Sequence, residues 1–512
     1  MRTRWHMDAD VVVIGLGAAG AAAAITAHDG GARVLVLEKQ EREKVVSNSS
    51  MAGGSFICPN DVHEARRYME SLCRVGADLY WTDPDVLQTW AQYTSGNKAW
   101  VEGMGVTGVT LARRGGEYKL PGYESIDIYR PGDMGGFGLM HLLCRQVKTR
   151  GIQVMHHTRA LKLLTDAKGE VSGVCATTGG EGAKPVNIKS RRAVILTTGG
   201  FEFDEEMKLQ FLKVYPTYFL GTPANTGDGI RMALGVGAHL WHMNCCSARL
   251  VMKFPDLAVA LNPVFGGKDW SSPWRETELA AETRGGREGE SNEAPSGVGY
   301  IMVDQTGKRY ARETFKPHSF YYELTGFDSQ KAFYPRVPSY WIFDRKRLDD
   351  GPLVRTGSGG AGPAGFYRWS EDNREELDRG WIIKGNTVKE LADRAGLDPA
   401  CLAETIHRYN ESCKQGKDVD FGRQRSTLVP LDTGPYYAVK LWPGGPNTQG
   451  GPQRNSRAQV VRSDGKPVPR LYSAGELGSI YGMLYPAGGG NLAECFAFGR
   501  IAGENASSES PL

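Results

Sequence analysis

The sequence predicts an α/β fold in which a domain built on a parallel sheet is interrupted by a second, α+β domain. Two observations at the start of the chain carry this prediction. A β-branched apolar run, Val11–Ile14, is followed at once by a glycine-rich turn and an alanine-rich stretch. A second apolar run, Val34–Leu37, comes after the length of one helix. Continuous apolar runs are typical of parallel strands that are buried on both faces, so the chain opens on a strand–helix–strand unit.

Length and composition predict a globular protein of more than one domain. The chain has 512 residues, and a domain usually takes roughly 100–200. Hydrophobic residues make up 40% and charged residues 23%, which excludes a disordered or fibrous chain. The formal net charge is only +3, too small for this length to favour binding to nucleic-acid phosphates. We therefore expect no nucleic-acid partner.

Cysteine usage and the first residues bear on the compartment. The nine cysteines are odd in number and include no C-x-x-C pair, so we expect reduced thiols and neither a disulfide framework nor a metal site. The first ten residues lack the apolar region of a signal peptide, and no apolar run has the length of a membrane span. The expectation is a cytoplasmic protein without an integral membrane segment.

The turn after the first strand carries a dinucleotide-binding motif. Gly15, Gly17 and Gly20 have the spacing G-x-G-x-x-G, and Ala18 and Ala19 complete the turn into the helix. Such glycines allow a tight turn and bring backbone N–H groups against a pyrophosphate at the helix N-terminus. The alternative is a glycine-rich turn that only permits close packing of helix and strand.

An acidic residue stands where this motif needs one. Glu38 ends the second apolar run, close to the spacing of about 20 residues expected for the acid that accepts a hydrogen bond from a ribose hydroxyl. Lys39 follows it, and we assign it to the same site. With both strands, the turn and the acid present, the sequence predicts dinucleotide binding.

Two later segments indicate which dinucleotide is bound. Arg191–Phe201 is a buried strand that ends in a glycine pair, and Thr226–Ile230 precedes a helix. They resemble the T-G-G and G-D-G segments of the two-domain flavoproteins, in which the acid meets the ribityl or phosphate region of the flavin. No second G-x-G-x-x-G supports a separate nicotinamide domain, so FAD is the predicted cofactor. The residues assigned to it here are Ala160, Thr198, Gly199, Gly200 and Asp228.

Segments near the C-terminus reveal a family resemblance. Leu471–Glu476 and Tyr485–Gly503, together with the N-terminal motif, resemble the fumarate reductase/succinate dehydrogenase flavoprotein superfamily. Ser50–Gly54 is similar to the segment that lies against the flavin ring in that superfamily. The resemblance covers nearly the whole chain, and Gly416–Arg423 is similar to the end of its cap domain.

The resemblance implies a Rossmann-like FAD-binding domain with an inserted α+β cap that holds the substrate and catalytic groups. Residues 1–250 would form the first part of the FAD-binding domain, 251–434 the cap, and 435–512 the C-terminal part of the FAD-binding domain. The backbone around Gly488–Leu492 would hold the isoalloxazine ring, and Glu476 would reach the ribityl chain.

The same resemblance bears on how FAD is attached. Where covalently flavinylated members carry a histidine, this chain has Ser47, so non-covalent FAD is expected. The further cofactor contacts that the resemblance implies are Ser50, Met51, Gly53, Gly54, Gly490, Asn491 and Leu492.

The positions that hold a dicarboxylate in this superfamily carry no cation here. Dicarboxylate-reducing members use a histidine, an arginine, and a proton-donating arginine four residues after a glutamate. The matching positions are Pro446 or Asn447, Pro486, and Pro317 after Glu313. Because a buried dicarboxylate without cationic partners faces a large desolvation cost, fumarate-type chemistry is disfavoured.

Tyr485 and the four residues after it resemble instead the Y-P-G-A-G segment of the 3-ketosteroid dehydrogenases. That resemblance implies Tyr485 as the group that takes a substrate proton and the Gly489 N–H as part of a clamp on the ketone. The second tyrosine of that family falls at Pro317. The sequence does not choose among the nearby substitutes, which are Lys316, His318, Tyr321 and Tyr322.

These assignments predict an FAD-dependent dehydrogenase that introduces a C=C bond next to a ketone of an apolar, steroid-like substrate, or reduces that bond in the reverse direction. Hydride would pass to flavin N5 while Tyr485 assists removal of the proton. Free tyrosine has a pKa near ~10, so a neighbour must lower it or a relay must carry the proton away. The electron acceptor or donor is not identified by the sequence.

Three alternatives stay open. One is a reductase of a carboxylated alkene that uses other cations, namely Lys316, Arg454 or Arg457. Another is a flavoprotein subunit that only passes electrons within a complex. For Tyr485 itself, the alternative is a buried tyrosine that is hydrogen-bonded for packing.

Overall fold

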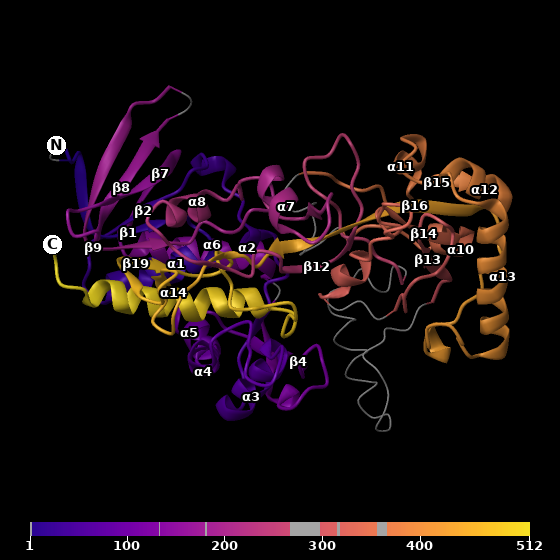
Figure 1. Cartoon of the computed structure of the whole chain (residues 1–512), viewed down its shortest axis with the longest axis horizontal. Coiled ribbons are helices and arrows are strands. Elements are labelled where there is room, and N and C mark those ends of the chain that lie inside the picture. Colours follow the sequence, from indigo (N-terminus) through magenta and orange to yellow (C-terminus); the bar gives the residue numbers. More distant parts are fainter. Residues whose placement is uncertain (1–2, 133, 180–181, 267–296, 315–317, 356–365) are drawn as a thin grey trace. The chain divides into compact units, whose positions relative to one another are not determined.

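The computed structural model describes residues 3–132, 134–179, 182–266, 297–314, 318–355 and 366–512. The chain divides into two compact units (Figure 1). Unit 1 comprises Met1–Leu212, Gly221–Ser247 and Asn447–Leu512, and unit 2 comprises Lys213–Leu220 and Ala248–Pro446. Two residues that the sequence brought forward for the site, Lys316 and Pro317, lie outside the described residues.

Unit 1 is built on a sheet with the strand order β18-β19-β9-β1-β2-β6. Strand β1 pairs in parallel with β2 and with β9, and the β7–β8 hairpin joins the edge of β9. The predicted strand–helix–strand unit is confirmed, with Val13 of β1 opposite Val36 of β2. The strands are β1 (Met7–Ile14), β2 (Val34–Leu37), β6 (Gln153–Met155), β7 (Thr158–Thr165), β8 (Val171–Thr178), β9 (Pro185–Leu196), β18 (Gln459–Val461) and β19 (Pro467–Ser473).

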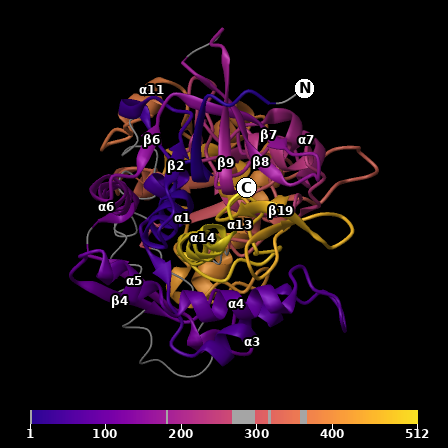
Figure 2. The same ribbon diagram turned by 90° about the vertical axis from the view of Figure 1, so that its left-hand side faces the viewer.

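Two helices from opposite ends of the chain pack against each other beside this sheet. Helix α1 (Ala18–Asp29) and helix α14 (Gly490–Ser508) lie side by side (Figures 1 and 2). A Cβ atom on Gly499 or Gly503 of α14 would lie only 2.7 or 2.6 Å from a carbonyl oxygen of α1. Glycine on one helix and alanine on the other therefore allow the two backbones to approach closely.

The remaining elements of unit 1 complete its hydrophobic core, which includes Phe56, Leu87, Trp90 and Phe496. They are α2 (Asn48–Met51), β3 (Phe56–Ile57), α3 (Val62–Cys73), α4 (Pro84–Thr94), α5 (Asn97–Gly103), β4 (Val109–Arg114), β5 (Asp127–Pro131), α6 (Gly135–Thr149), α7 (Glu205–Phe211), α8 (Asp228–Leu234), β11 (Leu240–Trp241) and β17 (Gly451–Pro452).

Unit 2 is α+β, with helices packed on a mostly antiparallel sheet of order β10-β16-β14-β13, to which β12 and β15 add through β16. Helices α12 and α13 contribute Leu391, Leu402 and Ile406 to its core. The elements are β10 (Tyr218–Phe219), β12 (Cys246–Val251), β13 (Tyr300–Val303), β14 (Ser339–Asp344), α10 (Arg345–Asp349), α11 (Arg374–Asp378), β15 (Ile383–Gly385), α12 (Val388–Ala395), α13 (Pro399–Gln415) and β16 (Tyr436–Thr448).

The described ranges contain neither a membrane-spanning helix nor a cluster of metal-binding side chains. No helix there combines the length and the hydropathy that crossing a bilayer requires. Nor do three or more His, Cys, Asp or Glu side chains gather there in a way that could hold a metal ion.

Candidate functional site

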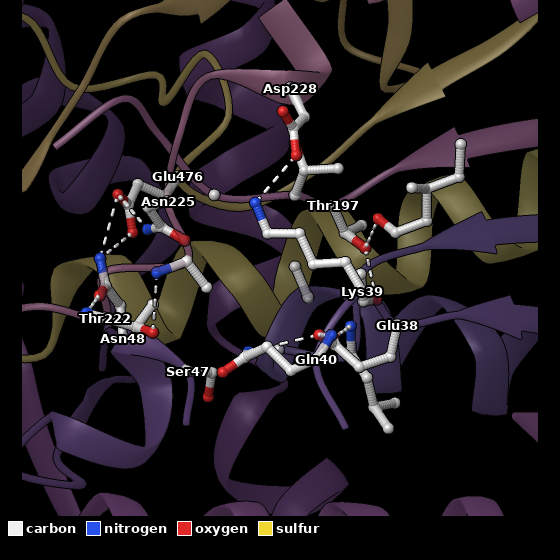
Figure 3. Close-up of a pocket in the computed structure, with 18 of the residues that line it drawn as sticks. Glu38, Lys39, Gln40, Ser47, Asn48, Thr197, Thr222, Asn225, Asp228 and Glu476 are labelled. Atoms are coloured by element: carbon white, nitrogen blue, oxygen red, sulfur yellow. Dashed lines mark hydrogen bonds and ion pairs between the residues drawn. The ribbon is translucent and has the colours of Figure 1, made fainter. Parts of the chain in front are cut away.

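A cavity opens in unit 1 where β1, β2 and β9 end (Figure 3). Parallel sheets usually bind ligands at the carboxyl ends of their strands. Many of the residues assigned to the cofactor from sequence line this cavity: Gly15, Gly17, Ala18, Ala19, Glu38, Lys39, Ser47, Ala160, Thr198, Gly199, Asp228 and Glu476.

The three glycines of the N-terminal motif do three different things. Gly15 has φ +101°, and a Cβ there would lie 2.5 Å from the Thr197 carbonyl oxygen. At Gly17 the nearest atom to a Cβ would be Ser49 Oγ at 3.7 Å, so its backbone is open to the cavity. At Gly20 a Cβ would meet the Gly15 carbonyl oxygen at 2.0 Å. Gly15 makes the turn, Gly17 admits a ligand, and Gly20 lets helix α1 pack on the strand.

Glu38 is buried at the edge of the cavity and is oriented by backbone donors. Its Oε2 accepts a hydrogen bond from the Leu16 N–H at 3.0 Å, and its Oε1 accepts one from the Gln40 N–H at 2.9 Å. Oε1 also accepts from the Gln40 side-chain amide at 3.3 Å. A carboxylate oxygen has two lone pairs, so Oε2 keeps acceptor capacity for a ribose hydroxyl. The arrangement fits the role that the sequence assigned to this acid.

Asp228 lies between two cations on the opposite wall of the cavity. Its carboxylate oxygens are 2.8 Å from Lys39 Nζ and 2.7 Å from Arg159 Nη2. Burial by itself would raise the pKa of Asp228, but Lys39 and Arg159 hold it below its usual value. Arg159 is a residue that the sequence did not single out, because nothing local to β7 marks it as a partner of Asp228.

Asn48 and Asn225 are the main lining residues that sequence reasoning missed. The Asn48 side-chain amide donates to both carboxylate oxygens of Glu476, at 3.2 and 3.0 Å. Its Oδ1 accepts the Thr222 N–H at 2.8 Å. The Asn225 amide nitrogen lies 3.5 Å from Glu476 Oε1. Both asparagines point toward the Glu476 carboxyl in Figure 3.

Other predicted cofactor contacts have structural roles outside the lining of this cavity. Ser50 and Ser47 form a reciprocal cap at the start of α2. A Cβ on Gly54 would lie 2.5 Å from the Gly135 backbone, and one on Gly200 would lie 2.1 Å from Thr448 Oγ1. The predicted residues that do not line the cavity are Gly20, Ser50, Met51, Gly53, Gly54, Gly200, Gly490, Asn491 and Leu492.

Tyr485 lies at the N-terminus of helix α14. Its hydroxyl oxygen accepts the Asn491 N–H at 2.7 Å, and its ring lies 5.4 Å from that of Tyr481. Burial raises the pKa of Tyr485, while the Asn491 N–H acts in the opposite direction and burial prevails. Gly489 begins the helix with φ +91°, and a Cβ there would lie 2.7 Å from the Ser55 carbonyl oxygen.

The two catalytic candidates from the cap lie in unit 2. The Tyr321 hydroxyl accepts the Val214 N–H at 3.2 Å, and its side chain is buried. His318 Nδ1 is 3.0 Å from Arg249 Nη2. Since a guanidinium can only donate, Nδ1 accepts, and the imidazole in this contact carries its proton on Nε2. Arg249 was not expected from the sequence.

The two described cations that the sequence offered for a carboxylated substrate are engaged within unit 1. Arg454 is fully buried and pairs with Glu494 on α14. Arg457 is exposed, and its Nε donates to Asn505 Oδ1 at 3.0 Å. At the proline that replaces a superfamily arginine, the Pro486 carbonyl oxygen accepts from the Tyr68 hydroxyl at 2.9 Å and from the Glu117 N–H at 2.8 Å.

Comparison with known families agrees with this geometry. Residues 10–247 and 283–492 match the FAD binding domain family. The chain belongs to this family. The cavity provides what FAD requires, namely an open glycine, a helix N-terminus and a ribose-binding acid.

Curated relatives include two kinds of oxidoreductase. Urocanate reductase of Eggerthella lenta is 28% identical over 98% of this chain and 75% of its own. Fumarate reductase (cytochrome) of Shewanella frigidimarina is 27% identical over 99% of this chain and 78% of its own. 3-Oxosteroid 1-dehydrogenase of Mycolicibacterium smegmatis is 28% identical over 70% of this chain and 59% of its own. The protein is an FAD-dependent oxidoreductase.

Solved structures share the fold. The 3-ketosteroid Δ1-dehydrogenase from Sterolibacterium denitrificans superposes with a TM-score of 0.79 at 20% identity, covering 98% of this chain and 99% of that one. The open conformation of a flavocytochrome c3 fumarate reductase gives 0.68 at 24% identity, covering 98% and 78%. The predicted fold class and the predicted superfamily are confirmed.

Proposed function

We propose that this protein is an FAD-dependent dehydrogenase that introduces a C=C bond next to a ketone of an apolar, steroid-like substrate, or reduces that bond in the reverse direction. The observation that carries the proposal is the position of Tyr485, whose hydroxyl accepts the Asn491 N–H at the N-terminus of α14. A relative that acts as a 3-oxosteroid 1-dehydrogenase supports it. Pro446 and Pro486, which replace cationic residues, also favour a neutral substrate.

In this reaction a hydride leaves one substrate carbon and a proton leaves its neighbour. FAD supplies the two-electron oxidant, and an acceptor outside the chain reoxidises it. The Asn491 N–H and the dipole of the 19-residue helix α14 stabilise negative charge on the Tyr485 oxygen. Because burial raises the pKa of Tyr485, the hydroxyl accepts the substrate proton only as its own proton moves on. His318 and Tyr321 of unit 2 are further proposed catalytic residues, and the Gly489 N–H is proposed to polarise the ketone.

The role of Tyr485 is tested by Tyr485→Phe, which removes the hydroxyl and keeps the ring. With a 3-ketosteroid that bleaches the flavin anaerobically, we expect kcat to fall roughly 10²–10⁴-fold at unchanged FAD content. Tyr481→Phe is the matched control, because it also removes a buried hydroxyl, one that bonds the Gly490 carbonyl at 2.9 Å. Near wild-type turnover in Tyr485→Phe would leave packing as the role of this tyrosine.

We also propose that FAD is held without a covalent bond, by the Gly17 backbone, Glu38, Asp228 and Glu476. Acid precipitation of the purified protein should release all of the flavin as FAD, because Ser47 stands where covalently flavinylated members carry histidine. Flavin that stays on the precipitated protein would contradict this.

The placement of the cofactor is tested by Gly17→Ala. The added methyl would project into the cavity without a clash, 3.7 Å from Ser49 Oγ, so the apoprotein should fold and FAD affinity should fall at least about tenfold. Gly103→Ala, where a Cβ meets nothing within 4 Å, is the matched control and should bind FAD as the wild type does. Unchanged affinity in Gly17→Ala would place FAD elsewhere.

A second candidate is a reductase of a carboxylated alkene. The observation that favours it is Arg249, whose guanidinium donates to His318 at 3.0 Å and brings a positive charge to this part of unit 2. Fumarate and urocanate reductases among the relatives are as similar in identity as the 3-oxosteroid enzyme. Under this alternative, urocanate or fumarate perturbs the flavin spectrum at micromolar concentration and Arg249→Gln abolishes the effect. Under the leading proposal, a cyclic enone perturbs the flavin spectrum at micromolar concentration, and fumarate leaves it unchanged even at millimolar concentration.

A further inference from the structure

Two carboxyl groups meet at the wall of the cofactor cavity without a cation between them. Glu202 follows the glycine pair after β9 and is fully buried. Glu476 follows β19 and lines the cavity. A Cβ on Gly200 would lie 2.7 Å from Glu202 Oε1 and 2.9 Å from Glu476 Oε1, so the two carboxyls flank the same α-carbon and interact directly.

The hydrogen bonds around the pair indicate where a proton can sit. Glu476 accepts from three N–H groups, the Asn48 amide at 3.2 and 3.0 Å, the Gly200 N–H at 3.2 Å and the Asn225 amide at 3.5 Å, and its side chain also interacts with that of Glu202. Glu202 Oε1 accepts the Thr448 N–H at 2.6 Å and the Thr448 hydroxyl at 2.7 Å. The fourth oxygen, Glu202 Oε2, is buried and has no hydrogen-bond partner among the described residues.

The charged and titratable groups around the pair do not neutralise it. Lys39 and Arg159, which reach the same cavity, are paired with Asp228. Arg454 is paired with Glu494. Two buried thiols also interact electrostatically with the pair, Cys246 with Glu202 and Cys495 with Glu476. Two ionised carboxylates at this distance would repel each other strongly in a buried setting.

We propose that Glu202 and Glu476 together hold one proton, so that the pair carries a single negative charge at the wall of the cofactor cavity. Burial and the adjacent Glu202 raise the pKa of Glu476 well above its usual value, in agreement with this geometry. In such a pair the titration belongs to both groups together.

This state of charge has a consequence for the cofactor, and that consequence rests on the proposed assignment of the cavity to FAD. When the shared proton is lost at higher pH, the cavity gains a second negative charge near an anionic pyrophosphate. FAD affinity should therefore weaken as pH rises, by at most about tenfold per pH unit for one proton. Protonation of the Glu202–Glu476 pair is thus coupled to FAD binding.

Glu202→Gln is a close mimic of the protonated pair. Its amide oxygen can accept from Thr448 as Glu202 Oε1 does, and the neutral amide removes one negative charge from the pair while keeping the size of the side chain. Glu206→Gln is the matched control, because Glu206 is exposed on the neighbouring helix α7 and loses the same formal charge.

The first test is infrared spectroscopy of the purified holoprotein at about pH 7. We expect the C=O band of a protonated carboxylic acid in the wild type and in Glu206→Gln, and its loss in Glu202→Gln. Absence of this band from the wild type, or its persistence in Glu202→Gln, would overturn the shared proton.

The second test measures FAD dissociation constants of the stripped protein from about pH 6 to about pH 9 by flavin fluorescence. We expect Kd to rise with pH in the wild type and in Glu206→Gln, and to be nearly constant in Glu202→Gln. Parallel pH profiles in all three proteins would overturn the coupling to FAD. Neither test uses a substrate, so failure of the proposed dehydrogenase reaction would leave both results interpretable.

Discussion

Each unit of the molecule buries a pair of carboxyl groups, and the two pairs differ in their hydrogen-bond and ion-pair partners. In unit 2, Arg309 donates to Glu313 at 2.6 Å and to Asp418 at 2.9 Å. Arg423 adds a second cation, 3.4 Å from Glu313. In unit 1, Glu202 and Glu476 have amide, hydroxyl and backbone partners, and no cation pairs with them in the part of the chain that the structure describes. The network of unit 2 is balanced in charge, and the pair of unit 1 is not.

The difference teaches what each group can do. Arginine does not deprotonate in proteins, so the charges of the unit 2 network are fixed. Its two guanidinium groups also lie over the Tyr409 ring, each at 5.2 Å. A carboxyl pair without a cation can change its charge by one proton, and Glu476 of this pair lines the cavity of unit 1. We therefore expect the charge-balanced network of unit 2 to stabilise the fold, and the unbalanced carboxyl pair of unit 1 to change its charge with pH.

The largest expected effect comes from breaking the balance in unit 2. Arg309→Met would leave Glu313 and Asp418 buried with one cation between them, and should lower the free energy of unfolding by about 3–5 kcal/mol. Denaturant titration, with limited proteolysis to follow unit 2, measures this. The double variant Arg309→Met/Glu313→Leu removes an opposite pair of charges and should recover part of the loss. A single variant as stable as the wild type would mean that the network contributes little.

A smaller effect is expected from the Asp228 ion pairs of unit 1, which are partly open to solvent. Asp228→Asn should cost about 1 kcal/mol in the apoprotein at neutral pH. Lys39 and Arg159 hold the pKa of Asp228 below its usual value of 3.8. Its stabilising contribution is therefore present above that value and is lost as pH falls through the folded-state pKa. The stability difference between wild type and Asp228→Asn should shrink in acid, and a constant difference would contradict the assignment.

Glu202→Gln should change stability little at low pH and should flatten its pH dependence. The pKa of Glu476 is raised from 4.5 in the folded state. The wild type therefore has the full contribution of the shared proton below about pH 4.5 and loses it as pH rises through the folded-state pKa. When the free energy of unfolding is measured from about pH 4.5 upwards, it should decline more steeply with pH in the wild type than in Glu202→Gln. Equal slopes would mean that the pair does not bind a proton more tightly on folding.

The smallest effect is expected at an exposed ion pair. Lys389 and Asp393, one turn apart on α12, are 2.8 Å apart and solvent-exposed. Lys389→Ala should change the free energy of unfolding by no more than about 0.5 kcal/mol, because screening and side-chain entropy offset the attraction. Added salt should reduce this difference in the free energy of unfolding between the wild type and Lys389→Ala. If Lys389→Ala lowered the free energy of unfolding as much as Arg309→Met, burial would not explain the difference between the exposed and the buried ion pairs.

Much of unit 1 could be predicted because its signals are local. The apolar runs Val11–Ile14 and Val34–Leu37 indicate buried strands by composition alone, and the spacing of Gly15, Gly17 and Gly20 predicts the turn between strand and helix. The structure adds the reason for each glycine, since only Gly17 is open to the cavity. Residues such as Ser50 and Gly54 were assigned to the cofactor by resemblance, and here they cap a helix and admit a neighbouring backbone.

The sequence by itself determined the fold class, because periodicity and short motifs act within a few residues of one another, and its resemblance to flavoprotein segments indicated FAD. Only the tertiary structure decided the partners of Glu476. Asn48 lies 428 positions from Glu476 along the chain. Glu202 and Glu476 both lie beside the Gly200 α-carbon. Side chains so distant in sequence show no diagnostic spacing. Glu202 follows β9 and Glu476 follows β19, and the pairing of these two strands brings the carboxyl groups together. The charge of the cavity wall is therefore a property of the folded sheet and of no single motif.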